Sequence, residues 1–219
     1  MGQDLAHKRP WLLLSLLFGL TYPLANMLAV PGIGALIWKM AGLALLVPYA
    51  LRRHHSGEFA ILAGVLVLCA VGDGLVEISL ETGAIAFGAA HILAIYLYSR
   101  HRRVKPVRSQ QMLGYTVLIA TPVIAYFLAG ALAAGYSVLL GGMAAMAWTS
   151  NFPRYRVGVG AMLFVISDLL IFAREGVLTG NAAVGLGIWY FYYIGMLLIA
   201  TGVVQTLVKR GHFADGAGL

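Results

Sequence analysis

The run ILAGVLVLCAVGDGLVEI, residues 61–78, is long enough to cross a bilayer, yet it contains an aspartate, Asp73. A second apolar run, VGVGAMLFVISDLLIF at residues 157–172, contains Asp168 in the same way. An ionised carboxylate inside a membrane costs several kcal/mol unless it lines a polar cavity or has a partner. The two runs therefore predict membrane-spanning helices, and their aspartates are the first candidates for functional residues.

The composition of the whole chain also predicts a membrane protein. Hydrophobic residues make up 61% of the 219 residues and charged residues only 11%, and the mean hydropathy is +0.87. Because a spanning helix needs roughly 20 apolar residues, we predict an all-α, polytopic membrane helix bundle that forms one integral-membrane domain over residues 1–219. The predicted spans, about eight in number, cover residues 11–30, 32–51, 59–79, 83–99, 111–130, 132–149, 156–174 and 183–207.

The connections between spans predict the topology. The third and fourth spans are separated only by the polar stretch SLET, and the fifth and sixth only by Gly130 and its small neighbours, so both pairs are predicted to form tight hairpins. Lysine and arginine stay on the cytoplasmic side, and here they cluster in alternate connections, which predicts that both termini are cytoplasmic. The clusters are Lys8 and Arg9, Arg52 and Arg53, Arg100 to Arg108, Arg154 and Arg156, and Lys209 and Arg210. The opposite connections carry Glu77, Glu81 and Glu175, of which Glu77 is predicted to be solvated.

Several classes of protein do not fit the sequence. The net charge of +7 comes from residues that flank spans, so anionic lipid headgroups are expected as partners and nucleic acid is not. The single cysteine, Cys69, lies within a span and is read as a small packing residue. The chain contains no G-x-S-x-G or H-E-x-x-H motif, and His91 is the only histidine within a predicted span. We therefore expect no metal and no cofactor.

Ionisable side chains inside the spans fall at one predicted depth. At about 1.5 Å per residue, their distances from the predicted helix ends place them in the outer half of the bilayer, with His91 slightly deeper. These side chains are Lys39, Asp73, His91 and Asp168, and the tyrosines Tyr190, Tyr192 and Tyr193 reach a similar level. A shared depth predicts a pocket that opens toward one leaflet.

Each of these residues also has a structural interpretation. Lys39 could extend its ammonium to the interface, and His91 could hold helices together by a hydrogen bond. Trp189 and Tyr190 suit an interfacial aromatic belt, whereas Tyr193 lies deeper and is the better site candidate. The two aspartates could be paired structural carboxylates.

The order and spacing of these residues resemble the YhhN-like lysoplasmalogenase family. The motifs that carry the resemblance run from the second span to the last: Trp38-Lys39, Gly72-Asp73, Gly88-Ala89-Ala90-His91, Gly160-Ala161 followed by Ser167-Asp168, and Tyr190 to Tyr193. Two positions depart from the family's pattern. Met40 follows the lysine where the family usually has proline, and Met196 replaces a frequent glutamine or histidine, which removes a polar group from the expected pocket.

This resemblance implies an eight-span, metal-independent hydrolase. It would cleave the vinyl ether bond of a lysoplasmalogen, a lysophospholipid, to a fatty aldehyde and glycerophosphoethanolamine or glycerophosphocholine. Such a reaction begins with proton delivery to the alkene carbon, and water then captures the oxocarbenium ion, much as glycosidases use one protonated and one ionised carboxyl group. Asp73 and Asp168 could take these roles in either order, with His91 orienting a group or relaying a proton. Lys39 or Tyr193 would hold the phosphate or glycerol oxygens.

Two other functions remain compatible with the same residues. Intramembrane aspartate and histidine side chains also serve proton-coupled transporters of small or lipid-like substrates, and a lipid-binding membrane protein would need neither flux nor turnover. The composition suggests the cytoplasmic membrane of a bacterium. Small-residue helix faces fit a monomer and a homodimer equally well.

Overall fold

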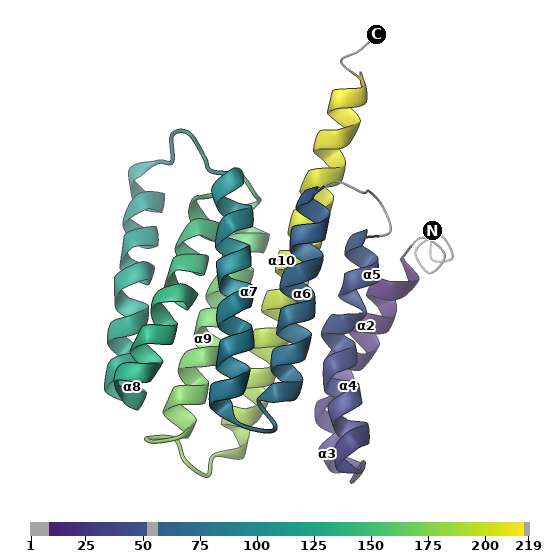
Figure 1. Ribbon diagram of the computed structural model, residues 1–219, viewed down its shortest axis with the longest axis vertical. Coiled ribbons are helices and arrows are strands. Elements are labelled where there is room, and N and C mark those ends of the chain that lie inside the picture. Colours follow the sequence, from purple (N-terminus) through teal and green to yellow (C-terminus); the bar gives the residue numbers. More distant parts are fainter. Residues whose placement is uncertain (1–8, 52–56, 217–219) are drawn as a thin grey trace. The chain divides into compact units, whose positions relative to one another are not determined.

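The computed structural model describes residues 9–51 and 57–216, and nearly all of these residues are helical (Figure 1). Within these two ranges the only β-type pairing is an isolated bridge between Arg102 and Ser150. The fold class is therefore all-α, as predicted. Lys8, Arg52 and Arg53, which contributed to the predicted orientation, lie outside the described residues.

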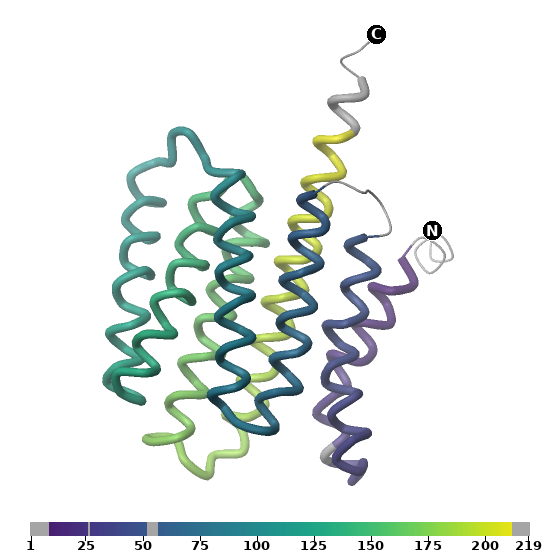
Figure 2. The backbone as a smooth tube through the Cα atoms, viewed as in Figure 1, coloured from purple at the N-terminus to yellow at the C-terminus, as the bar shows by residue number. Residues whose placement is uncertain are grey.

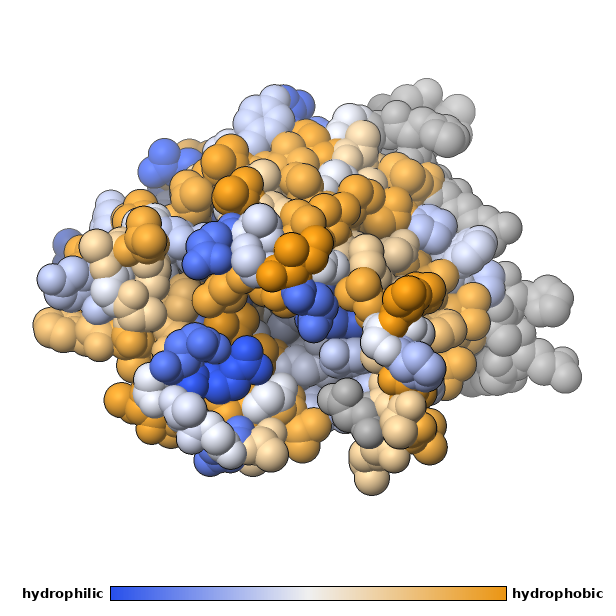
Figure 3. Space-filling view, turned by 60° about the horizontal axis from the view of Figure 1, so that its bottom comes forward, coloured by the Kyte–Doolittle hydropathy of each residue, from blue (hydrophilic) through white to orange (hydrophobic). Residues whose placement is uncertain are grey.

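Long apolar helices dominate the described residues. Six of them are long and apolar enough to cross a membrane: Gly32–Leu51, Gly57–Leu75, Leu80–Arg100, Arg108–Thr149, Arg154–Arg174 and Ala182–Gly211. Apolar residues also predominate on the surface seen in Figure 3, where polar residues form separate groups, and large side chains such as Phe127 and Leu132 are more than four-fifths exposed. A soluble protein rarely exposes so much apolar surface, so the chain is a multi-pass integral membrane protein.

The chain forms two compact units, unit 1 (Met1–Ala90) and unit 2 (His91–Leu219). The boundary falls inside helix α7 (Leu80–Arg100), whose first half belongs to unit 1 and whose second half begins unit 2. The prediction of one integral-membrane domain remains a prediction.

Unit 1 contains α2 (Pro10–Thr21), α3 (Pro23–Met27), α4 (Gly32–Ala44), α5 (Leu46–Leu51) and α6 (Gly57–Leu75). Prolines decide where several of these helices stop and start. Proline has no N–H and suits a first helical position, and α2 and α3 both begin with one. Pro48 cannot bond to the carbonyl of Ala44, where α4 ends. The first predicted span, 11–30, is therefore divided between two short helices.

Unit 2 contains α8 (Arg108–Thr149), the π-helix η1 (Arg154–Gly158), α9 (Val159–Arg174) and α10 (Ala182–Gly216). Helix α8 reverses direction at Gly130, so its two halves run antiparallel (Figures 1 and 2). Gly130 has φ 82° and ψ −165°, a conformation that is essentially restricted to glycine. The reversal separates the predicted spans 111–130 and 132–149 and confirms the predicted hairpin.

The backbones of α9 and α10 touch at a pair of glycines. A Cβ atom added to Gly160 would lie 2.5 Å from the carbonyl oxygen of Gly195, and one added to Gly195 would lie 2.6 Å from that of Gly160. Directly before Asp168 in the sequence, Ser167 donates a hydrogen bond of 2.9 Å to the carbonyl of Ile188. Direct backbone contact and this bond hold α9 and α10 together, and they fix the part of α9 that carries Asp168.

Candidate active site

A chain of hydrogen bonds links three helical segments of unit 2. His91 comes from α7, Tyr136 from the second half of α8 and Asp168 from α9. His91 Nε2 lies 3.0 Å from Tyr136 Oη, and Tyr136 Oη donates to Asp168 Oδ2 at 2.6 Å. The structure thus connects two of the residues predicted from the sequence through a third that was not predicted.

The number of hydrogens on each group gives the chain a direction. A phenol has one hydrogen, and Tyr136 gives it to Asp168, so the bond from His91 must be donated by Nε2–H to the phenol oxygen. The chain therefore runs from the imidazole through the phenol to the carboxylate oxygen. Hydrogen bonds in such a series polarise one another, and the one that ends on a carboxylate gains most.

Aromatic rings surround this chain and keep water away. His91 is 1% exposed and Asp168 6% exposed. The Phe164 ring makes T-shaped contacts with His91 at 5.0 Å and with Tyr192 at 5.1 Å, and the Phe172 ring meets Tyr136 edge-on at 6.2 Å. Electrostatic interactions are stronger in such an environment than in water, so the hydrogen bonds of this chain matter more than they would at an exposed site.

Two of the tyrosines predicted at the depth of the site, Tyr192 and Tyr193, extend the aromatic wall along α10. Trp189 lies 5.8 Å from Tyr192 and stacks on Tyr193 at 5.9 Å with 10° between the rings. Tyr192 and Tyr193 are buried, and Tyr190 is half-buried. Trp189 is only 5% exposed, because its ring packs on the tyrosines. Its place in an interfacial belt stays a prediction. Met196, also buried, lies further along the same helix.

Unit 1 holds the second predicted carboxylate. Asp73 lies on α6 and is 3% exposed. Its two glycine neighbours admit large side chains: a Cβ on Gly72 would lie 2.9 Å from the Phe87 ring, and one on Gly74 would lie 3.1 Å from the sulfur of Met40. Met40, one of the two departures from the family pattern, thus packs beside the backbone that carries Asp73.

Lys39 forms an ion pair in unit 1. Its Nζ donates to Glu77 Oε1 at 2.7 Å. The Lys39 side chain is 12% exposed and that of Glu77 is 53% exposed. The solvation of Glu77 stays a prediction. Next to Lys39, Trp38 donates to the hydroxyl of Thr21 at 3.1 Å, which ties α4 to α2.

Tyr136 is the site residue that the sequence analysis missed. It lies less than two turns after the reversal at Gly130, and Asp168 lies less than two turns before the end of α9. Tyr136 and Asp168 thus lie at similar distances from their helix ends, but this alone does not distinguish Tyr136 from the other tyrosines of the helices. Among the described residues, no group of three or more His, Cys, Asp or Glu side chains is placed to hold a metal ion.

These observations define a polytopic α-helical membrane protein with a carboxylate buried among aromatic rings. The YhhN family model matches residues 34–203, so the chain belongs to the YhhN family. The matched range includes Lys39, Asp73, His91, Tyr136 and Asp168. No curated protein and no solved structure shows a significant match to this chain. Membership in this family is consistent with a hydrolase.

Proposed function

We propose that this protein is a lysoplasmalogenase-type hydrolase, which cleaves the vinyl ether bond of a lysophospholipid to a fatty aldehyde and a glycerophospho-alcohol. The observation that carries the proposal is the buried carboxyl group of Asp168, bonded to Tyr136 and enclosed by aromatic rings, in a chain of the YhhN family. The hydrophobic rings suit both the alkenyl chain and a positively charged oxocarbenium ion, which aromatic faces attract.

The proposed reaction uses two carboxyl groups. A protonated carboxyl group gives its proton to the alkene carbon, and the resulting oxocarbenium ion takes up water. The hemiacetal that forms then breaks into aldehyde and alcohol. A second, ionised carboxylate stabilises the cation and takes the proton of the attacking water. Asp168 and Asp73 are the two carboxylates buried within apolar helices of the described residues, and we assign them these roles.

Substrate binding is assigned to side chains at the edges of the apolar region. We propose that Lys39 binds the phosphate, since an ammonium is a natural partner for that group, and that Tyr190, Tyr192 and Tyr193 contact the glycerol oxygens or the first atoms of the chain. Lys39 would exchange Glu77 for the phosphate when substrate binds.

The membrane topology belongs to the same proposal. Counting the halves of α8 separately, and joining α2 to α3 as one short span, gives eight crossings with both termini in the cytoplasm. The orientation rests on the basic residues of the Arg100–Arg108 loop and of the segments that contain Arg154 and Lys209. A bacterial cytoplasmic membrane is the proposed location.

The test is aldehyde release from lysoplasmenyl-ethanolamine by purified protein in detergent. The wild type should release aldehyde without any ion gradient, and the saturated-ether analogue should not react, because it has no alkene to protonate. Asp73→Asn and Asp168→Asn should each lower kcat by at least about 1,000-fold, since they remove proton transfer and charge stabilisation together. Both variants should purify as well as the wild type.

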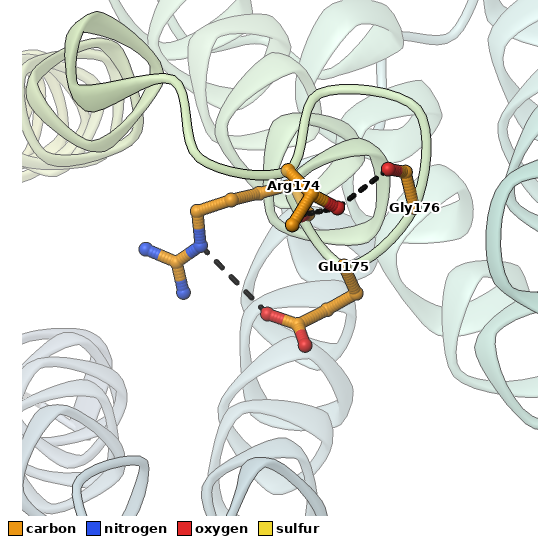
Figure 4. A network of polar contacts seen from close by, with 4 residues as sticks. Arg174, Glu175 and Gly176 are labelled. Atoms are coloured by element: carbon orange, nitrogen blue, oxygen red, sulfur yellow. Dashed lines mark hydrogen bonds and ion pairs between the residues drawn. The ribbon is translucent and has the colours of Figure 1, made fainter.

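A matched control uses a carboxylate of the exposed rim. Glu175 lies 3.7 Å from the Nε atom of Arg174 at the end of α9, as Figure 4 shows, and its side chain is 58% exposed. Glu175→Gln should keep wild-type turnover. Full activity in either aspartate variant would refute the assigned roles. A folded wild type that moves a lipid across vesicles in response to a proton gradient, and releases no aldehyde, would establish a transporter instead.

A further inference from the structure

Resting on the proposed function, we propose that Tyr136 is a positioning residue for Asp168 and that His91 acts through Tyr136 rather than on the substrate. In this assignment Asp168 delivers its proton from Oδ1, while Oδ2 stays bonded to the phenol. The assignment also separates the two aspartates, because it makes Asp168 the proton donor and leaves Asp73 as the ionised partner.

The two carboxyl oxygens of Asp168 differ in their hydrogen bonding. Tyr136 donates its hydrogen to Oδ2 at 2.6 Å. In a neutral carboxyl group the carbonyl oxygen is a much stronger hydrogen-bond acceptor than the hydroxyl oxygen, so an oxygen that accepts a short hydrogen bond is the carbonyl oxygen. The proton of the neutral carboxyl group therefore resides on Oδ1, and this oxygen is the one free to deliver it.

Negative charge develops on the Asp168 carboxyl group during proton delivery. As the proton leaves Oδ1, the carboxyl group becomes a carboxylate, and its negative charge spreads onto Oδ2. The Tyr136 hydroxyl already points at Oδ2, so its hydrogen bond strengthens as the charge grows and costs no reorganisation. An interaction that is stronger in the transition state than in the ground state raises kcat and leaves substrate binding unchanged.

His91 supports the hydrogen bond that Tyr136 gives to Asp168. His91 Nε2 lies 3.0 Å from the phenol oxygen. In the tautomer that carries its hydrogen on Nε2, His91 donates to this oxygen and makes the phenol a better donor to Asp168. The His91 ring is also held by the Phe164 ring at 5.0 Å and the Tyr136 ring at 5.6 Å. With Nε2 directed at Tyr136 and the ring fixed between aromatic neighbours, His91 orients the phenol much as the third member of a catalytic triad orients its base.

The test first removes the hydroxyl group of Tyr136 and then changes the acidity of the phenol. Tyr136→Phe keeps the ring that contacts His91 and Phe172 and loses only the hydroxyl group, so it should lower kcat about 10- to 100-fold with little change in KM. Substituting 3-fluorotyrosine or 3,5-difluorotyrosine at position 136 makes the phenol a stronger donor and should raise kcat above that of Tyr136→Phe and of the wild type. A hydroxyl with a purely structural role would not give a kcat that follows phenol acidity.

The matched control is Tyr126→Phe, on the first half of the same helix α8. The Tyr126 side chain is exposed, so this variant should keep wild-type kcat and KM. His91→Phe should lower kcat less than Tyr136→Phe, and the two changes combined should cost no more than Tyr136→Phe alone, because His91 acts through the phenol.

The outcomes separate the inference from the function on which it rests. An active wild type with an equally active Tyr136→Phe variant overturns the role of Tyr136 and leaves the hydrolase intact. A Tyr136→Phe variant that loses activity through KM alone also overturns the role of Tyr136. A kcat that is the same for tyrosine and fluorotyrosine at position 136 overturns it as well. A wild type that releases no aldehyde overturns the proposed function and this assignment with it.

Discussion

The two units stabilise polar and charged side chains within apolar helices in different ways. In unit 1, Lys39 and Glu77 form an ion pair of opposite charges, and more than half of the Glu77 side chain is exposed. In unit 2, His91, Tyr136 and Asp168 form a chain with at most one formal negative charge when the imidazole is neutral, and its two ends are almost completely buried. Where water can reach, charges are tolerated as they are; where it cannot, each polar group needs a direct partner.

This difference bears on what each group can do. An exposed ion pair is weak, because water and salt compete for both charges. It can open to admit a charged ligand at little cost. A buried hydrogen-bonded chain is rigid and holds a carboxyl group in one orientation. The first arrangement suits binding and the second suits proton transfer.

The largest expected effect comes from the packing that supports the buried chain. In Gly160→Ala the new Cβ would meet the Gly195 carbonyl oxygen at 2.5 Å, a backbone atom that cannot move without shifting α10. We expect a loss of about 1 to 3 kcal/mol in unfolding free energy, measured by thermal or denaturant unfolding in detergent.

The control for this prediction lies in unit 1. In Gly74→Ala the new Cβ would meet the sulfur of Met40 at 3.1 Å and its Cε at 3.4 Å, both at the end of a flexible side chain. Both changes replace a helical glycine by alanine and gain the same helix propensity, so their difference reports packing. Equal stability of the two variants would show that the α9 and α10 backbones are not in contact.

A second prediction concerns the coupling within the buried chain. Asp168→Ala leaves the Tyr136 hydroxyl without the acceptor it has at 2.6 Å, which should cost about 1 to 3 kcal/mol. Adding Tyr136→Phe removes the second member of the lost hydrogen bond, so the double variant should be more stable than the sum of the single losses predicts, by about 0.5 to 2 kcal/mol. Strict additivity in a double-mutant cycle of unfolding free energies would contradict the hydrogen bond.

The helices of this protein could be predicted from the sequence because their signal is local. Uninterrupted apolar runs indicated the long helices, and Gly130 was identified as a turn because its small neighbours interrupt the run there. The division of residues 11–30 into α2 and α3 was missed, although Pro23 offered the signal for it. Here Pro23 begins a new helix, α3.

The candidate site was predicted only in part, because partners are set by tertiary packing. Asp168 and His91 were selected since charge and polarity inside apolar runs are visible in the sequence. Tyr136 was not selected, because tyrosine is common in membrane helices. The role of its hydroxyl depends on its partner, Asp168, which only the tertiary structure shows. For the same reason Glu77 was identified as solvated, but its bond to Lys39 was not foreseen.

The smallest expected effect tests the exposed ion pair. Glu77→Gln should lower the unfolding free energy by less than about 1 kcal/mol, and Lys39→Gln by less still. The order follows from burial: removing Glu77 strands the Lys39 ammonium, whose side chain is 12% exposed, whereas removing Lys39 leaves a Glu77 carboxylate that is 53% exposed. An unpaired charge costs more where less water reaches it.

The salt dependence of stability tests the same comparison, because screening acts on exposed charges far more than on buried groups. Raising the NaCl concentration should therefore shrink the difference between wild type and Glu77→Gln and leave the coupling between Asp168 and Tyr136 unchanged. A salt-dependent coupling in the buried chain would mean that water reaches Asp168 in the folded protein, and the contrast between the two units would then be one of degree.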